Sequence, residues 1–529
     1  MNRKPNFLII QADQLAARAL AAYGNKVCKT PAIDRIAAAG TVFENTICNF
    51  PLCGPSRGSM MSGLLAFNAK LFDNGAEYAA GIPTFAHYLR ILGYQTCLSG
   101  KMHFVGPDQL HGFEERLITD IYPSDFNWAA NWTKGTNANE PDRLLAAAGE
   151  VNGLLHSGVY NRTVQMDYDD DVCFRAVRKI HDFARSDDTR PFCLVTSFTH
   201  PHDPFIVTQD YWDRYDPAEI DMPHIGRLPR EALDPHSRRI YDHVGIAQAD
   251  MSEDDVRLAR HGYYAAISYI DDQVAKLHEA LEVAGVADNT VVIVVSDHGE
   301  ALGERGLWFK RSFYDAALKV PLIVSIPGRD QAPRCAENAA LVDLLPTLVD
   351  LADPADGLSG IEAGYDGRSL VPATRGEPLA GPNIVYGEMA ADGLTAPAVA
   401  IIENQFKYIH CDTDPPMLFD LAADPHETRN LCGTSEAAGV EARMAAMVHQ
   451  KWDLGAITAE VLETQRRRRA VDRAHMLGAA PSWDYDVFVP GRTAYFRGIP
   501  VNPSASNYAS NFDIRLRPDT ERPNPRIFP

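Results

Sequence analysis

The run Asn6-Phe7-Leu8-Ile9-Ile10 passes directly into the polar ending Gln11-Ala12-Asp13-Gln14. This run predicts a buried parallel strand, because continuous β-forming residues are typical of strands that are covered on both faces. Polar side chains at the carboxyl end of such a strand point into the crevice where open α/β sheets keep their sites. Asp13 and Gln14 are therefore candidate site residues, although Asp13 would equally serve to cap the next helix.

A second apolar run, residues 290–296, ends in the same way and delivers Asp297 and His298. Helices are predicted at residues 30–40 and 83–93, where helix start and stop signals are in place. Each of them precedes a candidate strand, and this alternation favours parallel pairing. We therefore expect an α/β fold with a large, mainly parallel central sheet flanked by helices.

The chain divides where residues 372–382 become rich in Pro and Gly. We expect a catalytic α/β domain over residues 1–375 and a subdomain over 376–455, in which strands at 384–388 and 406–410 form a smaller antiparallel sheet. Residues 456–529 turn helical and then rich in proline, with aromatic side chains at Trp483, Tyr485, Tyr495 and Phe496. An irregular tail cannot bury such side chains alone, so we predict that it wraps a neighbouring subunit of a homo-oligomer.

Composition and net charge exclude some classes of protein. The chain has 529 residues, 46% of them hydrophobic, with a net charge of -20 and a pI near 5.3. This charge argues against a nucleic-acid surface, so an anionic substrate must be met by a local basic pocket. The one basic run, residues 466–469, is interpreted as a solvated helix face or a subunit contact.

Cysteine usage and the N-terminus predict a location. Nine scattered cysteines form neither a disulfide framework nor a CxxC zinc site. Residues 1–5 lack the apolar stretch of a secretory signal, and no segment approaches the length that crosses a bilayer. A cytoplasmic protein without membrane attachment is expected.

Residues 51–63 place Cys53 at the start of a short helix, because Pro55 fits the first helical turn. A randomly chosen cysteine is most often core, but the Pro, Gly, Ser and Arg neighbours describe an exposed turn that carries a cation. Residues 54–58 also fit the G-x-S-x-G nucleophile elbow. An elbow must follow a strand directly, whereas residues 49–51 interrupt the strand predicted at 42–47.

Further along, Lys101 and His103 follow a predicted strand. Alternate residues of an extended chain face the same way, which suits two donors that meet one tetrahedral anion. His200 and His202 follow another strand, at residues 191–198, and are likewise candidate site residues.

Cys53-x-Pro55-x-Arg57 followed by Ser62-Gly63 resembles the sulfatase signature, in which the cysteine is oxidised to formylglycine. Residues 93–103 resemble the second sulfatase signature. Residues 73–78 and 99–128 are similar to choline sulfatases, and Gln14 with His298 resembles the choline sulfatase and phosphonate monoester hydrolase branch of the alkaline phosphatase superfamily. At 142–149 the chain departs from the Trp/Tyr-His-Asn segment of choline sulfatases, so the alcohol part of the substrate is left open.

The resemblance implies a complete site. It implies catalytic roles for Cys53, Arg57, Lys101, His103, His200 and Lys310, metal ligation by Asp13, Gln14, Asp297 and His298, and substrate contacts by Trp128 and Glu388. It implies one divalent metal, Ca²⁺ first and Mn²⁺ second, because carboxylates favour the former and an imidazole the latter.

The implied mechanism begins with a hydrated formylglycine that attacks sulfur. Arg57 orients it, while Lys101 and Lys310 stabilise the sulfuryl oxygens. His200 with Lys101 serves the leaving alcohol, His103 takes the proton that lets sulfate depart, and His202 only orients its neighbours.

The expected function is hydrolysis of small alkyl or aryl sulfate monoesters. Maturation by a formylglycine-generating enzyme is implied. A phosphonate monoester hydrolase or phosphodiesterase is the alternative within hydrolases, because the same site suits a singly charged phosphoryl diester. A non-catalytic anion-binding relative is disfavoured, because every catalytic position of the family is filled.

Overall fold

The computed structural model describes residues 4–126, 128–135, 151–247, 249–329, 333–355, 359, 361, 363–479 and 482–485. Its centre is an eight-stranded sheet in the order β10-β2-β9-β8-β1-β6-β3-β4. Strands β8, β1, β6, β3 and β4 run parallel, and β10 is parallel to β2, whereas β9 is antiparallel to both of its neighbours. The predicted mainly parallel sheet is confirmed. The strands are β1 (Asn6–Ala12), β2 (Thr41–Ile47), β3 (Gln95–Gly100), β4 (Glu115–Arg116), β6 (Phe192–Phe198), β8 (Thr290–Ser296), β9 (Leu322–Ser325) and β10 (Arg334–Ala340).

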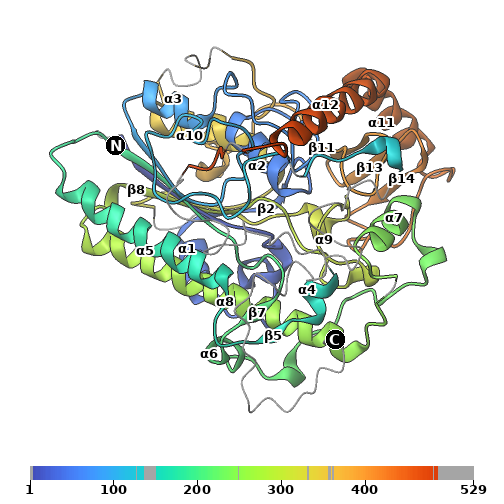
Figure 1. The fold of residues 1–529 in the computed structure, drawn as a ribbon, viewed down its shortest axis with the longest axis horizontal. Coiled ribbons are helices and arrows are strands. Elements are labelled where there is room, and N and C mark those ends of the chain that lie inside the picture. The colour runs from blue at the N-terminus through green and yellow to red at the C-terminus, as the bar shows by residue number, and fades with distance from the viewer. Residues whose placement is uncertain are drawn as a thin grey trace.

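Helices cover both faces of this sheet (Figure 1). One face carries α1 (Pro31–Ala39), α5 (Val164–Arg185) and α8 (Glu253–Val283), and the other carries α2 (Cys53–Ser62), α3 (Phe85–Ile91) and α10 (Leu344–Ala352). Strand β1 shows why two layers form. Because side chains alternate along a strand, Phe7 and Ile9 join one apolar cluster, whereas Leu8 and Ile10 join the other.

Shorter elements connect these layers. They are α4 (Val151–Leu155), α6 (Gln209–Trp212), α7 (Pro235–His243), α9 (Asp315–Leu318), and the pair β5 (Gly158–Val159) and β7 (Ile206–Val207).

A separate four-stranded antiparallel sheet follows, as predicted. It consists of β11 (Ile384–Met389), β12 (Ala398–Glu403), β13 (Phe406–Cys411) and β14 (Asp414–Asp420). Helices α11 (Ala438–Lys451) and α12 (Leu454–His475) come next, so the chain does turn helical after Trp452. Most of the predicted oligomerisation tail, residues 486–529, lies outside the described residues, as do residues 142–149. The predicted division into three domains, at 375/376 and 455/456, stays a prediction.

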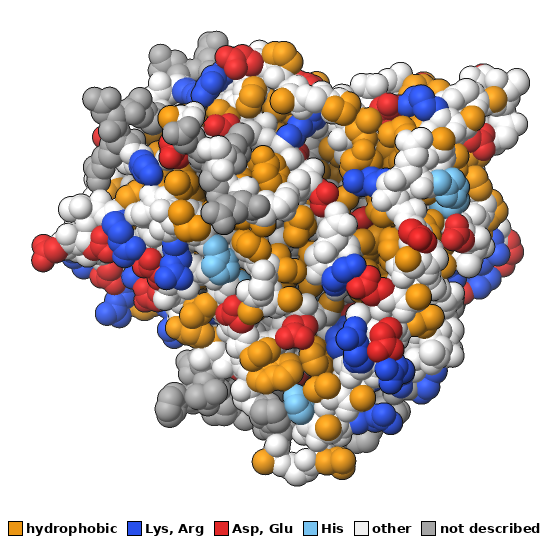
Figure 2. Space-filling view, turned by 90° about the horizontal axis from the view of Figure 1, so that it is seen from above, with side chains coloured by type: hydrophobic (Ala, Val, Ile, Leu, Met, Phe, Trp, Pro, Cys, Tyr) orange, Lys and Arg blue, Asp and Glu red, His pale blue; other side chains and the backbone are white. Residues whose placement is uncertain are grey.

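The described surface has mixed charge. On the face in Figure 2, acidic and basic side chains are interspersed. None of the helices among the described residues is long and apolar enough to cross a membrane. All nine cysteines are unpaired thiols.

Candidate active site

Helix α2 presents Cys53 as its first residue, directly after the extended Leu52. The predicted helix start is confirmed, but the predicted exposed turn is wrong. Cys53 is 1% exposed and Arg57 is fully buried. Burial is tolerated because Arg57 finds two carboxylate partners, which the local sequence around Cys53 does not contain.

Those partners come from the two polar strand ends. Strands β1 and β8 pair in parallel with Ala12 opposite Ser296, so the next residues, Asp13 and Asp297, meet at the same edge of the sheet. Arg57 bridges them, with Nη2 donating to Asp13 Oδ2 at 2.9 Å and Nε donating to Asp297 Oδ2 at 2.8 Å. The planar guanidinium thereby fixes the relative position of both carboxylates.

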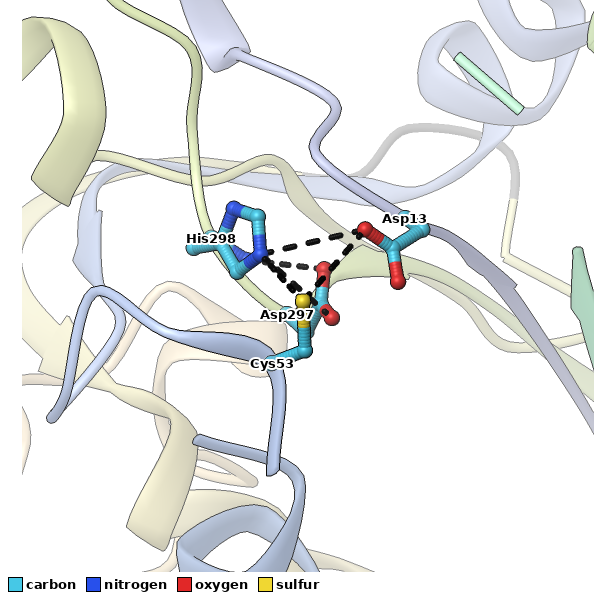
Figure 3. A group of neighbouring side chains, drawn as sticks. All are labelled: Asp13, Cys53, Asp297 and His298. Atoms are coloured by element: carbon cyan, nitrogen blue, oxygen red, sulfur yellow. Dashed lines mark hydrogen bonds and ion pairs between the residues drawn. The ribbon is translucent and has the colours of Figure 1, made fainter. Parts of the chain in front are cut away.

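His298 completes a compact group with Cys53, Asp13 and Asp297 (Figure 3). One ligand atom from each of these residues lies within 4.8 Å of all the others. The Cys53 Sγ lies 3.1 Å from His298 Nε2 and 3.9 Å from Asp13 Oδ1. Two buried carboxylates and one imidazole on converging strand ends form a donor set that fits a divalent cation.

Gln14, the fourth predicted metal ligand, contacts this group through its backbone, since its N–H donates to Asp297 Oδ1 at 3.1 Å. Its side chain reaches elsewhere. Nε2 donates to Glu300 Oε2 at 2.6 Å and to Asp203 Oδ1 at 3.3 Å, while Oε1 accepts from Lys310 Nζ at 2.6 Å. Two acceptor carboxylates fix which way the amide faces, so Oε1 is turned toward Lys310.

Electrostatics favour an anion at position 53. Burial raises the pKa of the Cys53 thiol, but Lys101, Lys310 and His298 outweigh it and hold that pKa well below the usual value. Burial also raises the pKa of Asp13, and Lys101 with Arg57 brings it below its usual value. The site therefore stabilises negative charge at the place where a substrate anion would meet residue 53.

Lys101 and His103 both reach this site, but not through an extended chain. His103 has a left-handed φ of 59°. The Asp120 carboxylate holds this turn, because Oδ2 accepts from the backbone N–H groups of Met102 and His103 at 2.8 and 2.7 Å. Lys101 forms a buried ion pair with Asp13, and His103 is among the residues that lower the pKa of Cys53.

The two histidines after β6 have different surroundings. His200 Nδ1 lies 2.7 Å from Asp169 Oδ2, and its ring packs on Tyr269. His202 Nε2 lies 2.7 Å from Lys310 Nζ. His202, predicted only to orient its neighbours, thus contacts Lys310, another predicted catalytic residue. His200 instead contacts the carboxylate of Asp169, which lies on helix α5.

The two residues predicted to contact the substrate, Trp128 and Glu388, lie in different surroundings. Trp128 lies at the site, with its ring centroid 5.2 Å from that of His103 and 4.7 Å from that of Tyr122. Glu388 is 1% exposed and accepts from Trp452 Nε1 and the Phe67 N–H, each at 2.7 Å. These contacts join β11 to the segment after α2 and give no support to a substrate contact.

Several residues at the site were not singled out by the sequence reasoning. Asn74 accepts from the Gly54 N–H at 2.9 Å through Oδ1, and its carbonyl oxygen lies 3.0 Å from His103 Nε2. Burial raises the pKa of Asp120, yet Arg116 and His103 bring it down to about 2. Glu300 follows His298 by two residues, so its place after the strand was the one available signal.

Comparison with known proteins agrees with this geometry. The sulfatase family model matches residues 5–354, and a model described as "Choline sulfatase enzyme C terminal" matches residues 459–499. The chain is 41% identical over 500 residues to the choline-sulfatase of Rhizobium meliloti (strain 1021), covering 93% of this chain and 96% of that protein. An arylsulfatase of Clostridium perfringens is 26% identical over 455 residues, covering 82% and 91%.

Solved structures show the same fold. The phosphonate monoester hydrolase of Agrobacterium radiobacter superposes with a TM-score of 0.66 at 24% identity, covering 87% of this chain and 96% of that chain. The 2-O glycosaminoglycan sulfatase BT1596 superposes with a TM-score of 0.64 at 24% identity, covering 89% and 94%. The extent of the family match and the identity to the first relative settle the kinship: the chain belongs to the sulfatase family.

Proposed function

We propose that this protein hydrolyses small alkyl or aryl sulfate monoesters to an alcohol and inorganic sulfate. One observation carries the proposal: the Cys53 thiol lies among metal-type ligands, and two buried lysines, Lys101 and Lys310, act on it together. A thiol in a purely structural core would lack both features.

The family uses a formylglycine residue and a divalent metal. Cys53 is available for the first, and the neighbouring carboxylates and imidazole fit the second. We propose that Cys53 is the residue converted to formylglycine and that Asp13, Asp297 and His298 hold the metal, with Gln14 beside them. Ca²⁺ is the first candidate because of the two carboxylates, and Mn²⁺ the second because of the imidazole. When present, the metal supplies Lewis acidity and the formylglycine supplies the nucleophile.

The cationic residues of the chain would receive the sulfuryl group. Lys101 and Lys310 place fixed positive charge beside Cys53, where it stabilises developing negative charge without reorganisation. Arg57 fixes the positions of Asp13 and Asp297, and through them it would keep residue 53 in position for attack.

Proton transfer would use two histidines. The Asn74 carbonyl accepts from His103 Nε2, so in the neutral ring Nδ1 remains the proton acceptor. His202 Nδ1 lies 2.9 Å from the Asp203 carbonyl oxygen, which leaves Nε2 to share a proton with Lys310 Nζ. We assign the Lys310 and His202 pair to the departing alcohol oxygen, a role that the resemblance gave to His200 with Lys101.

The remaining parts are also proposals. A formylglycine-generating enzyme would be the maturation partner, and the C-terminal tail would join copies of the chain into a homo-oligomer. A cytoplasmic location stays a prediction. The similarity to a choline-sulfatase makes choline sulfate the first ester to assay.

Two measurements test the proposed function. Mass spectrometry of the peptide that contains Cys53, after expression with the maturation enzyme, should detect formylglycine. The purified protein should then show a higher kcat/KM for nitrophenyl sulfate than for a phenyl phosphonate monoester. The reverse preference would support the phosphonate monoester hydrolase instead, and unmodified cysteine in an active protein would refute the proposed nucleophile.

A further inference from the structure

The basic run at residues 466–469 on α12 does not behave as one solvated face. The side chains of Arg466 and Arg467 are 72% and 62% exposed and pair with Glu463 on the same helix. The Arg468 side chain is 8% exposed, and its two terminal nitrogens donate to both oxygens of Asp73 at 2.6 and 2.7 Å. Unlike the exposed ion pairs of Arg466 and Arg467, this bidentate pair is buried. It joins parts of the chain that are 395 residues apart.

Asp73 begins the loop that reaches the active site. Its Oδ1 also accepts from the Gly75 N–H at 2.9 Å, which fixes the backbone around Asn74. Gly75 packs against the backbone at Trp128 and Ala129 so closely that an added Cβ would lie 2.4 Å from the Ala129 nitrogen. The loop is therefore held from both sides.

Asn74 connects this loop to the reacting residues. Helix α2 begins after Leu52, which has no side-chain acceptor for the unpaired N–H groups of a helix start. Asn74 Oδ1 supplies that acceptor to Gly54, next to Cys53, and the Asn74 carbonyl oxygen orients His103. One loop residue thus caps the helix that carries the nucleophile and fixes the tautomer of its proposed proton acceptor.

Helix α12 has a second attachment one turn earlier. Gln465 Oε1 accepts from the Trp132 N–H at 2.9 Å, and Gln465 is itself buried. Residues of α12 and α2 belong to the same apolar cluster, although the two helices are far apart in the sequence. Helix α12 therefore packs against the loops around the active site.

We propose that Arg468 is a positioning residue for the proposed sulfatase reaction. Its clasp on Asp73 holds Asn74, and Asn74 in turn holds the start of α2 and the ring of His103. Arg468 touches neither substrate nor reacting atoms. Its loss should misplace the nucleophile and the proton acceptor together, whereas Lys101 and Lys310, which bind the anion, keep their places.

The test compares Arg468→Met with Arg467→Met in the full-length, formylglycine-bearing enzyme, with activity expressed per formylglycine measured by mass spectrometry. Arg467→Met should match the wild type. Arg468→Met should lower kcat on nitrophenyl sulfate about tenfold to a hundredfold with KM little changed, the size expected for a misplaced reacting group. Equal kcat values in the two variants would overturn the proposal.

A double variant separates positioning from stability, because Arg468→Met alone leaves the buried Asp73 charge unpaired. Asp73→Asn with Arg468→Met removes both charges and still offers an acceptor to Gly75. Its unfolding midpoint should return toward that of the wild type while kcat stays low. Recovery of kcat together with stability would show a purely structural pair and refute the inference.

Arg468→Lys gives a third measurement, since it keeps the charge but loses the two-pronged geometry. Its kcat should fall between those of the wild type and Arg468→Met. A wild-type kcat would contradict the proposed role of the bidentate pair between Arg468 and Asp73. If the wild type acts on phosphonate monoesters rather than on sulfate esters, the same kcat ratios are measured on that substrate. A failure of the proposed function would then appear in the substrate preference of the wild type. A failure of the Arg468 inference would appear only in the kcat ratios between the variants and the wild type.

Discussion

Two buried charge clusters in this protein have opposite compositions. Around Cys53, the cationic side chains of Lys101 and Lys310, with His298, act on one thiol and hold its pKa down against burial. Around Lys407 on β13, the carboxylates of Asp315 and Glu427 act on one ammonium and hold its pKa up against burial. Both clusters are desolvated, so burial alone does not distinguish a site from a structural ion pair.

What distinguishes them is the group at the centre. Lys407 is fully paired, and its third contact is the Phe313 carbonyl oxygen at 2.8 Å. The Cys53 cluster instead combines a potential nucleophile, ligand atoms for a metal and positive charge suited to a substrate anion. We therefore expect changes around Cys53 to alter activity and changes around Lys407 to alter stability.

The largest expected effect is that of Cys53→Ala, because it removes the proposed nucleophile. The kcat on nitrophenyl sulfate should fall by about 10⁴-fold or more, the scale seen when a nucleophile is removed. The free energy of unfolding should change far less, since only one sulfur atom is lost. Retained hydrolysis in this variant would rule out residue 53 as the nucleophile.

This contrast also shows how far the sequence could lead. The strand endings at Asp13 and Asp297 were predictable, because β1 and β8 read as buried parallel strands whose ends meet at one edge. The signature around Cys53 located the helix start as well.

The rest depends on contacts between distant segments. The burial of Arg57 follows from partners 44 and 240 residues away, which local composition does not reveal. The turn at His103 requires Asp120, and the pairing of His202 with Lys310 requires two loops to meet. The resemblance made Glu388 a substrate contact, but its two acceptor contacts join β11 to Phe67 and Trp452.

The second effect belongs to the other cluster. Lys407→Met should lower the free energy of unfolding by about 3–5 kcal/mol, because it leaves two buried carboxylates without their shared partner. Denaturant unfolding measures this loss, and kcat per folded enzyme should stay near the wild-type value. Lys70→Met is the control, since its ion pair with Glu460 is exposed and should contribute about 1 kcal/mol or less. A loss of kcat without a loss of stability in Lys407→Met would contradict the division between the two clusters.

Removal of one cation from the Cys53 cluster should have the third largest effect. Lys310→Met should reduce kcat by about 10²–10³-fold, the range for one donor to a developing negative charge. The reduction should be larger for an alkyl sulfate than for nitrophenyl sulfate, because we assign Lys310 with His202 to the departing oxygen and an alkoxide is the poorer leaving group. Equal losses on both esters would assign Lys310 to the sulfuryl oxygens alone.

The smallest effect concerns the alcohol half of the substrate. An indole face attracts a quaternary ammonium group by about 0.5–2 kcal/mol, which corresponds to about twofold to thirtyfold in kcat/KM. Trp128→Leu should therefore weaken hydrolysis of choline sulfate by that factor, but not hydrolysis of 3,3-dimethylbutyl sulfate, which has the same shape without the charge. Trp212→Leu is the matched control, because Trp212 stacks on His261 away from Cys53. Equal losses on the two esters would mean that Trp128 acts by packing against His103 and Tyr122, and the site would then select its alcohol by shape rather than by charge.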